Sequence, residues 1–318
     1  MSANTSTSHQ KRIPPRLVIA GAALMDRTGH LDAPSSLGCS NPGHFEESPG
    51  GAALNVARIA AAFGTTPTLV SVVGQDAAGD ALREETNSRG IEAQFEQSRK
   101  TSTGTYTSLI EPDGSLLVAM ADMAVYDDFN ADKLLPKMSE LSAEDWLCVD
   151  TNLPPEQTLK MLRASESNRV GLTVSKAKAP RLLKFAEYLD LLFTNRIEAG
   201  ALCGFDAEKT QSADGESFAR AFAKIGIGSA VISDGAQDVI LIENGEPSRI
   251  EVATVHQIVD VTGAGDALVG TSLCALMRGM PLANSVGFGI KAAQAIIQSR
   301  GALRSDLVEL VGELKAAK

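Results

Sequence analysis

Short apolar runs alternate with stretches of helical periodicity along most of this 318-residue chain. The apolar runs that are typical of buried strands occupy residues 17–22, 68–73, 146–149, 170–174, 190–193 and 230–233. Between the first two runs, residues 53–63 place Val56, Ile59, Ala60 and Phe63 on one face of a helix. Strands that alternate with helices favour an α/β fold, in which a mostly parallel sheet is covered by helices on both faces.

Two segments interrupt this alternation. Residues 29–49 are rich in Gly, Pro, Ser, Asn and His and show no helical period. Residues 101–120 alternate between apolar and polar on both sides of a turn at residues 112–114, which predicts a β-hairpin. We expect segments 29–49 and 101–122 to form a small β-layer that acts as a lid over a site at the strand ends.

The charge balance limits the classes of partner. The chain has 29 Lys and Arg residues against 39 Asp and Glu residues, a formal net charge of −10, and it has no basic tract. Such a chain is a poor general ligand for nucleic acid phosphates and for anionic membranes. No apolar run reaches the roughly 18–20 residues that span a bilayer. We therefore expect no nucleic acid partner and no membrane partner.

The cysteines and the N-terminal residues indicate the compartment and the domain organisation. The four cysteines are Cys39, Cys148, Cys203 and Cys274. None has C-x-x-C spacing, so we predict free thiols in a reducing cytoplasm rather than a disulfide or zinc framework. Residues 1–12 are polar and are predicted to be a disordered tail, not a signal peptide. Residues 13–318 are expected to form a single domain.

The stretch D-V-T-G-A-G-D at residues 260–266 carries the strongest chemical signal, and it follows an apparent strand and enters an apolar helix. Gly263 and Gly265 let several N–H groups point the same way at a helix N-terminus, where they form an anion site. Asp266 lies beside that site and can take a proton from an attacking hydroxyl. Taken alone, a helix-start acid or a simple turn is the alternative. A dinucleotide fingerprint is excluded because residue 268 is Leu, and no Walker loop occurs.

Two earlier stretches place polar groups near predicted turns. Gly50 and Gly51 permit close approach of a ligand to the backbone, and Asn55 offers the donor and the acceptor that a sugar hydroxyl needs. Asp26 follows the first strand at its C-terminal end, where open α/β sheets bind ligands. The alternatives are a glycine turn with a surface Asn and a solvated loop Asp.

Asn195 and Glu198 follow the apolar run that ends at Phe193 and lie one helical turn apart. On a shared face they could hold Mg²⁺ through water near a phosphate chain. The alternative is a helix start in which Asn195 caps and Glu198 occupies the third position.

These four stretches, in this order, resemble the ribokinase-like, phosphofructokinase-B type family of sugar kinases. Residues 50–55 and 260–266 match its two signatures, and the N-x-x-E motif is matched by Asn195 and Glu198. Residues 233–235 stand where the family usually has T-x-G. The resemblance covers roughly residues 16–310. It implies a three-layer α/β/α core with a mostly parallel central sheet and a small β-sheet lid.

The resemblance also implies ATP-dependent phosphorylation of a sugar-type hydroxyl, with Asp266 as the catalytic base and Gly263, Ala264 and Gly265 as the anion hole. The acceptor-binding residues that it implies are Asp26, Asn41, Gly50, Gly51, Asn55, Thr103, Asp122 and Asp150. The ATP-binding residues are Asn195, Ser233, Gly235 and Thr262. Mg²⁺ is expected through water at Asn195 and Glu198, and a monovalent cation, K⁺, at Asp260. The same resemblance implies a homodimer formed through the lid.

Within the family, three segments resemble the pseudouridine kinase subgroup. They are residues 40–43, residues 120–123, and Val174-Ser175 with Lys178. The chain departs from the subgroup because Leu172 and Thr173 replace its usual D-P pair, and the glycine loop that follows residue 235 is incomplete. The subgroup implies transfer to the 5′-hydroxyl of pseudouridine, with Asn41 and Asp122 contacting the base.

Three alternatives stand beside this interpretation. The chain could be another sugar or nucleoside kinase of the same family, acting on ribose, adenosine or a fructose phosphate. It could be a non-catalytic regulator on this fold, although the presence of Asp266 speaks against that. A nicotinamide dehydrogenase requires a G-x-G-x-x-G stretch, which residues 21–23 do not supply.

Overall fold

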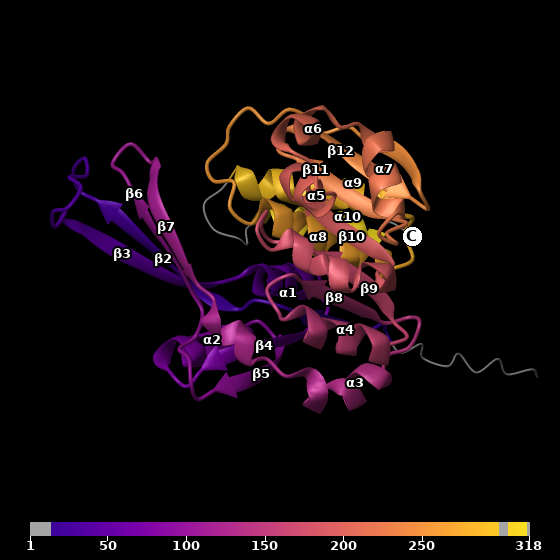
Figure 1. Ribbon diagram of the computed structural model, residues 1–318, viewed down its shortest axis with the longest axis horizontal. Helices are drawn as coiled ribbons and strands as arrows, with labels where there is room; N and C mark the ends of the chain where they lie inside the picture. Colours follow the sequence, from indigo (N-terminus) through magenta and orange to yellow (C-terminus); the bar gives the residue numbers. More distant parts are fainter. Residues whose placement is uncertain (1–13, 299–304, 317–318) are drawn as a thin grey trace, which may run out of the picture.

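The computed structural model describes residues 14–298 and 305–316 and arranges them around a sheet of nine strands (Figure 1). The strand order is β13-β12-β11-β10-β9-β8-β1-β4-β5. All neighbouring strands from β11 to β5 are parallel, whereas β12 runs antiparallel to both β11 and β13. The bounds are β1 Leu17–Ala20, β4 Thr68–Gly74, β5 Glu92–Ser98, β8 Trp146–Asp150, β9 Asn168–Leu172, β10 Leu191–Asn195, β11 Ala230–Asp234, β12 Gln237–Glu243 and β13 Glu246–Ile250. The predicted mostly parallel sheet is confirmed. The predicted tail, residues 1–12, lies outside the described residues.

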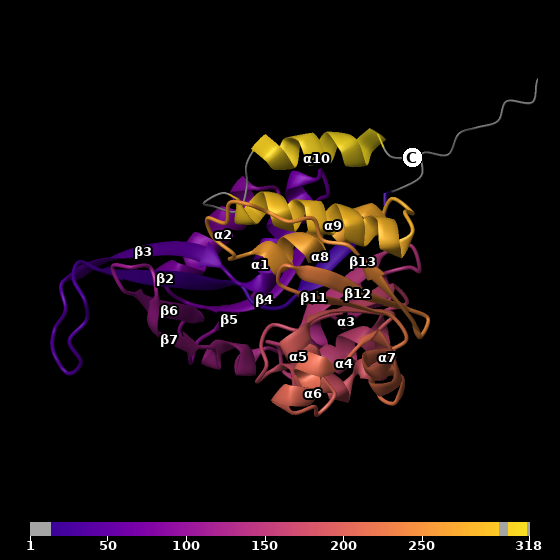
Figure 2. The same cartoon turned by 90° about the horizontal axis from the view of Figure 1, so that it is seen from above.

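Two layers of helices cover the sheet, because successive strand side chains face opposite sides (Figure 2). Leu17 and Ile19 of β1 pack into one apolar cluster, and Val18 and Ala20 pack into the other. The first layer holds α1 Ala52–Ala62, α2 Ala77–Ser88, α8 Ala264–Leu276, α9 Leu282–Ile297 and α10 Ser305–Ala316. The second holds α3 Leu135–Ser139, α4 Pro155–Ala164, α5 Arg196–Leu202 and α7 Gly215–Ala223, with α6 Ala207–Ser212 against α5. The predicted α/β/α architecture is confirmed.

Short 3-10 helices and side-chain caps complete the connections. The 3-10 helices span Ala124–Asp128, Ala131–Lys133, Ala179–Lys184 and Ala186–Tyr188. The helices α2, α5, α6 and α7 are capped by side-chain oxygens of Asp76, Asn195, Asp206 and Asp214. Each cap accepts an N–H of the first turn that has no partner inside the helix. In the part of the chain that the structure describes, no helix has the length and apolar character that crossing a bilayer requires.

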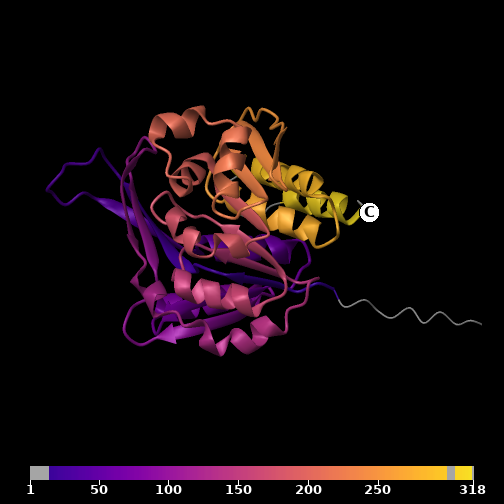
Figure 3. The same cartoon turned by 45° about the vertical axis from the view of Figure 1, so that its right-hand side comes forward.

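A second sheet of four strands, which we call the lid, projects from one edge of the core (Figures 1 and 3). Its order is β3-β2-β6-β7, with bounds β2 Leu24–Leu31, β3 Gly43–Gly50, β6 Thr105–Ile110 and β7 Leu116–Asp122. The β6–β7 hairpin appears as predicted, but the lid begins at Leu24, earlier than residue 29. Phe45, Val118 and Met120 on this sheet are more than half exposed, at 55%, 53% and 65%.

The strand expected directly before residue 260 is not formed. The edge strand β13 ends at Ile250, and residues 251–263 contain no strand. Ile258 and Val259, the apolar residues directly before Asp260, are exposed. The N–H of Val259 donates to the carbonyl of Ile297 at the end of α9 across 2.7 Å, so the backbone bonds to a helix end instead of to the sheet edge.

Candidate active site

The carboxyl ends of the parallel strands gather the predicted site residues along one edge of the large sheet. From β1 the sheet continues to β4 on one side and to β8 on the other, which creates a topological switch point where open α/β sheets bind ligands. Asp150 ends β8, and Asn195 and Ser233 are register partners at the ends of β10 and β11. Asp26 is placed differently from the prediction: it lies within lid strand β2, because the chain turns at residues 21–23 straight into the lid.

Asp266 lies in the first turn of α8, which begins after a left-handed glycine. Gly263 is the N-cap and has a φ of 80°, a conformation that glycine adopts without strain. The N–H of Ala264 makes a long hydrogen bond of 3.3 Å to the carbonyl of Val261. The N–H groups of Gly265 and Asp266 belong to the first helical turn, where no carbonyl of the helix precedes them. The turn therefore offers donors and the positive end of the helix dipole beside a carboxylate.

Asp266 is joined to α1 by a direct hydrogen bond. Nδ2 of Asn55 donates to Oδ2 of Asp266 across 2.8 Å. Desolvation raises the pKa of Asp266 to about 6; the Asn55 bond opposes this rise, and the charges of Asp150, Asp26 and Glu198 add to it. A carboxylate with that pKa is ionised at neutral pH and is still basic enough to accept a proton.

Two glycines shape the surroundings of Asp26. A Cβ on Gly50 would lie 1.9 Å from Oδ2 of Asp26, so this carboxylate rests against bare backbone. Gly51 has a φ of 101°, and a Cβ there would lie 2.5 Å from the carbonyl oxygen of Ala22. Desolvation raises the pKa of Asp26 to about 6, and the positive charge of Arg58 opposes the rise. Gly50, predicted to admit a ligand, thus also makes room for Asp26, and Gly51 makes room for the backbone of Ala22.

A cavity of about 300 Å³ opens beside Asp266, between strands β9–β11 and helix α8. Its lining residues include Asn195, Glu198, Ser233, Gly265 and Asp266. Oδ1 of Asn195 accepts the N–H of Glu198 across 2.9 Å and so caps α5. The buried Glu198 carboxylate accepts a hydrogen bond from the hydroxyl of Thr173. Asn195 is therefore a helix cap and a cavity residue at once, so the two interpretations that the sequence left open are compatible.

Two residues predicted to bind the phosphoryl acceptor, Asp150 and Thr103, are buried, and their side chains already make hydrogen bonds within the protein. Asp150 is buried and accepts hydrogen bonds from the N–H groups of Ala22 and Asn152, and burial raises its pKa. The hydroxyl of Thr103, also buried, donates to Asp76 and accepts the N–H of Gly74. Both residues brace the turns around the site, and their direct contact with an acceptor stays a prediction.

The two lid residues predicted to contact a base lie at opposite ends of the lid. Asn41 belongs to the loop between β2 and β3, which forms the outer end of the lid in Figure 1. Its amide bonds to backbone atoms of Ser36 and Cys39, and the structure does not bring it to Asp266. Asp122 ends β7 beside Thr105, where the lid joins the core, and is exposed.

The remaining candidates occupy turns. Gly235, with a φ of 58°, forms the turn between β11 and β12. Oδ1 of Asp260 accepts the N–H of Thr262 across 2.8 Å, which shapes the loop that leads to Gly263. Their predicted roles in ATP and cation binding stay predictions.

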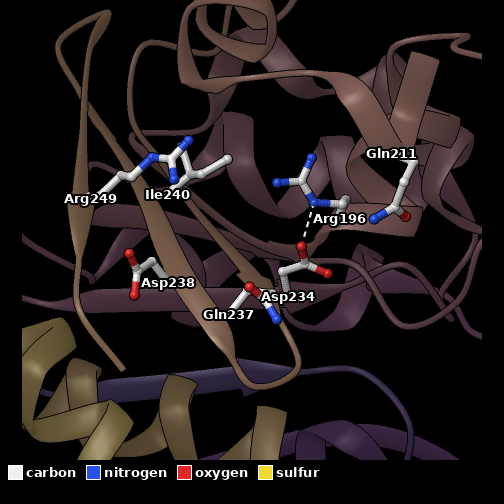
Figure 4. Close-up of a pocket in the computed structure, with 7 residues that line it drawn as sticks. All are labelled: Arg196, Gln211, Asp234, Gln237, Asp238, Ile240 and Arg249. Carbon is white, nitrogen blue, oxygen red and sulfur yellow. Dashed lines mark hydrogen bonds and ion pairs between the residues drawn. The ribbon is translucent and has the colours of Figure 1, made fainter. Parts of the chain in front are cut away.

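A larger cavity of about 520 Å³ lies on the other side of the β11–β12 hairpin (Figure 4). Its lining residues are Arg196, Gln211, Asp234, Gln237, Asp238, Ile240 and Arg249. Ile240 belongs to the apolar cluster beneath α5 and α7, whereas Phe193 and Leu268 of the Asp266 cavity belong to the opposite cluster. An ion pair of 2.6 Å joins Arg196 to Asp234 across this cavity. The larger cavity is therefore separate from the cavity that Asp266 and Glu198 line.

Two residues that the sequence prediction missed complete the polar contacts of the site. Thr173 holds the Glu198 carboxylate, and Arg58 donates to the amide oxygen of Asn55 across 3.1 Å. A signal for Arg58 was available: it is a charged residue one turn after Asn55, in a helix whose other residues are mostly apolar. Thr173 stood out in the sequence only as a departure from the subgroup's D-P pair, and its contact with Glu198 depends on the packing of the end of β9 beside α5.

Comparisons with known proteins agree with this geometry. The model of the pfkB family of carbohydrate kinases matches residues 15–308. The chain is 29% identical over 278 residues to the pseudouridine kinase of Escherichia coli (strain K12), covering 86% of this chain and 87% of that protein. A carbohydrate kinase from Agrobacterium tumefaciens superposes with a TM-score of 0.79 at 28% identity, over 94% of this chain and 97% of the other. The ribokinase of Arabidopsis thaliana, solved with ribose and ATP, shares the fold with a TM-score of 0.81 at 19% identity, over 95% and 99%.

Proposed function

Because this chain belongs to the pfkB family of carbohydrate kinases, we propose that it transfers the γ-phosphoryl group of ATP to the 5′-hydroxyl of pseudouridine. The observation that carries this proposal is the position of Asp266 beside the N-terminus of α8, on the wall of the cavity that Asn195 and Ser233 also line. A base, an anion site and a polar cavity that can hold phosphates meet there, as phosphoryl transfer requires.

Asp266 is the proposed general base. Its Oδ2 is bonded to Asn55, which leaves Oδ1 for the acceptor hydroxyl. With a pKa of about 6, the carboxylate is ionised at neutral pH and accepts the proton as the hydroxyl oxygen attacks phosphorus.

The first turn of α8 is the proposed anion hole. The N–H groups around Gly263, Ala264 and Gly265 stabilise the charge on the transferring group. A Cβ built on Gly265 has no neighbour within 4 Å, so the helix start faces open space where a phosphate fits. Because these donors are fixed by the helix, they need no rearrangement as charge develops.

Oxygen donors on the opposite wall fit a magnesium ion. Glu198 offers a carboxylate and Asn195 an amide oxygen, the ligand types that Mg²⁺ prefers, and both line the cavity. We infer that they hold Mg²⁺ through water, where it would neutralise the phosphate charge of ATP. The carboxylate of Asp260 and the hydroxyl of Thr262 are the proposed oxygen donors for K⁺ at the entry to α8.

The acceptor is proposed to lie between the lid and α1. Asp26 lies at the start of the lid, and Gly51 and Asn55 lie at the start of α1; their proposed role is to bind the hydroxyls of the ribose. Asp122, exposed where the lid joins the core, is the proposed contact for the ring N–H that distinguishes pseudouridine from uridine. A site that binds a substrate N–H strongly rejects an analogue that lacks it.

An acceptor screen tests the proposal. We expect kcat/KM for pseudouridine to exceed that for uridine, ribose, adenosine and fructose phosphates. Asp122→Ala should lower the pseudouridine-to-uridine ratio about 10-fold, as expected for the loss of a hydrogen bond to a charged group, and should leave KM for ATP unchanged. Equal kcat/KM for pseudouridine and uridine in the wild type would leave a related sugar kinase as the function. No turnover of any acceptor would favour a non-catalytic regulator.

The lid also supports a proposal about assembly and location. Phe45, Val118 and Met120 project from one sheet and are more than half exposed, as expected for a surface that pairs with a second copy. We propose a homodimer formed through this face. The four free thiols and the use of ATP support a cytoplasmic location.

A further inference from the structure

The guanidinium of Arg58 is tied to three segments around the site. Its Nε and Nη2 contact Oε1 of Glu85 on α2 at 2.8 and 2.6 Å. Its Nη1 donates to the carbonyl of Pro49, near the end of β3, across 3.0 Å. The same nitrogen donates to Oδ1 of Asn55 across 3.1 Å. One largely buried cation therefore links α2, the base of the lid and the amide that contacts Asp266.

These contacts permit only one orientation of the Asn55 amide. A guanidinium has donors alone and an ionised carboxylate has acceptors alone, so the amide oxygen must face Arg58 and the NH₂ group must face Asp266. The reverse orientation would set donor against donor and acceptor against acceptor. We propose that Arg58 is a positioning residue that holds Asn55 in this orientation, so that one oxygen of Asp266 is engaged and the other is free for the acceptor.

This proposal rests on the proposed function, in which Asp266 is the base. The groups that act on Asp266 come from four elements: Asn55 from α1, and the carboxylates of Asp26, Asp150 and Glu198 from β2, β8 and α5. Each carboxylate opposes ionisation of Asp266, and Asn55 is the group among these four that favours it. Loss of a correctly turned Asn55 therefore raises the pKa of Asp266.

A purely structural role for Arg58 is the competing hypothesis. Arg58 and Glu85 have side chains only 11% and 17% exposed, and a buried ion pair between them fastens α1 to α2. Glu85 also pairs with Arg89, which lies at the end of α2, is 38% exposed and makes no bond to Asn55. Arg89 thus pairs with the same carboxylate as Arg58 but does not contact Asn55, and it provides a matched control.

A double-mutant cycle between Arg58→Met and Asn55→Ala tests the proposal. The pH dependence of kcat is measured with the best acceptor of the screen. The pKa of Asp266 is followed independently by NMR of carbon-13-labelled aspartate carboxyls, with its signal assigned from Asp266→Asn. We expect Arg58→Met to raise the pKa of Asp266 by about one pH unit and to lower kcat about 10-fold below about pH 6, with KM for ATP unchanged.

The cycle separates positioning of Asn55 from a direct effect of charge and from a structural ion pair. If Arg58 acts through Asn55, its effect on the pKa of Asp266 disappears in the Asn55→Ala background. An equal shift in that background would show a simple effect of charge, and no shift in either background would show a structural ion pair. Either result overturns the proposal. A shift of the same size in Arg89→Met would also overturn it, because that variant leaves the Asn55 contact intact.

Two further controls keep the test decisive. Thermal unfolding establishes that each variant folds. If Arg58→Met does not fold, Glu85→Gln replaces it in the cycle, since it loosens the guanidinium and predicts a rise in the pKa of Asp266 that depends on Asn55. If the wild type has no turnover, the proposed function fails, but the NMR titration still decides whether Arg58 orients Asn55 toward Asp266.

Discussion

Replacing Asp266 with Asn should remove catalysis and stabilise the fold in the same molecule. The amide keeps the shape of the carboxyl and can still present an oxygen to Nδ2 of Asn55, so the 2.8 Å contact survives. It cannot accept the proton of the acceptor hydroxyl. We expect kcat to fall by about 10²–10⁴, the span typical of a lost general base.

The gain in stability follows from the pKa of Asp266. A carboxyl whose pKa rises from 3.8 to about 6 on folding destabilises the ionised native state by about 3 kcal/mol, at about 1.4 kcal/mol per pH unit. Because Asp266 is half-buried on the wall of a cavity, water lowers this to about 1–2 kcal/mol. The carboxyl is neutral in both states at low pH, so the advantage of the Asn variant is absent below about pH 4. It grows as Asp266 ionises and is complete above about pH 6.

Urea unfolding followed by the fluorescence of Trp146, the only tryptophan of the chain, measures this difference. Wild type and Asp266→Asn are compared at about pH 4 and about pH 8, and each comparison cancels the titrating groups that do not interact with Asp266. Equal stability at both pH values would refute the electrostatic argument. A kcat near that of the wild type would refute the assignment of Asp266 as the base.

Further variants address the anion hole, the turn, the metal and the lid. Gly265→Val should fold with unchanged stability, because a Cβ there meets nothing within 4 Å, yet lose ATP turnover by filling the phosphate space; normal turnover would refute the anion hole. Gly51→Ala, at a φ of 101° and with a Cβ 2.5 Å from a carbonyl oxygen, should instead lower the melting temperature, by about 3 °C if the strain is about 2 kcal/mol. Glu198→Gln should raise the Mg²⁺ concentration needed for half-maximal activity; an unchanged requirement would exclude its metal role. Met120→Asp should shift the protein from dimer to monomer in sedimentation, and a wild type that is monomeric would refute the lid interface.

Much of this fold and site was predictable because local patterns carry long-range consequences. The spacing of apolar residues in 53–63 predicts a helix, and Ala52–Ala62 forms one, since a period near 3.6 can bury one face only in a helix. Apolar runs such as 68–73 predict strands with both faces buried. The glycines at 50–51 and 263–265 predict turns, and Gly51 and Gly263 have the positive φ that few other residues accept. The candidate base Asp266 follows from its place after such a turn.

The strand expected before residue 260 shows where a local pattern is insufficient. Ile258 and Val259 have the apolar character of a strand, but a strand also needs a neighbour with free backbone groups. In the tertiary structure the N–H of Val259 bonds to the end of α9. Whether an apolar segment becomes a strand is thus decided by what lies beside it.

The amino-acid sequence by itself determined the alternation of strands and helices, the two glycine turns and the identity of the chemical groups. Only the tertiary structure decided which of those groups meet. It set Asn55 against Asp266, although 211 residues separate them, and it left the Asn41 amide bonded within the outer loop of the lid. It also placed the Arg58 side chain, only 11% exposed, against the amide oxygen of Asn55, although a charged residue is usually expected on the surface. The physical reason is that a side chain's type and helical phase are local properties, whereas its partners and its pKa depend on segments that only the packing of the sheet and its helices brings together.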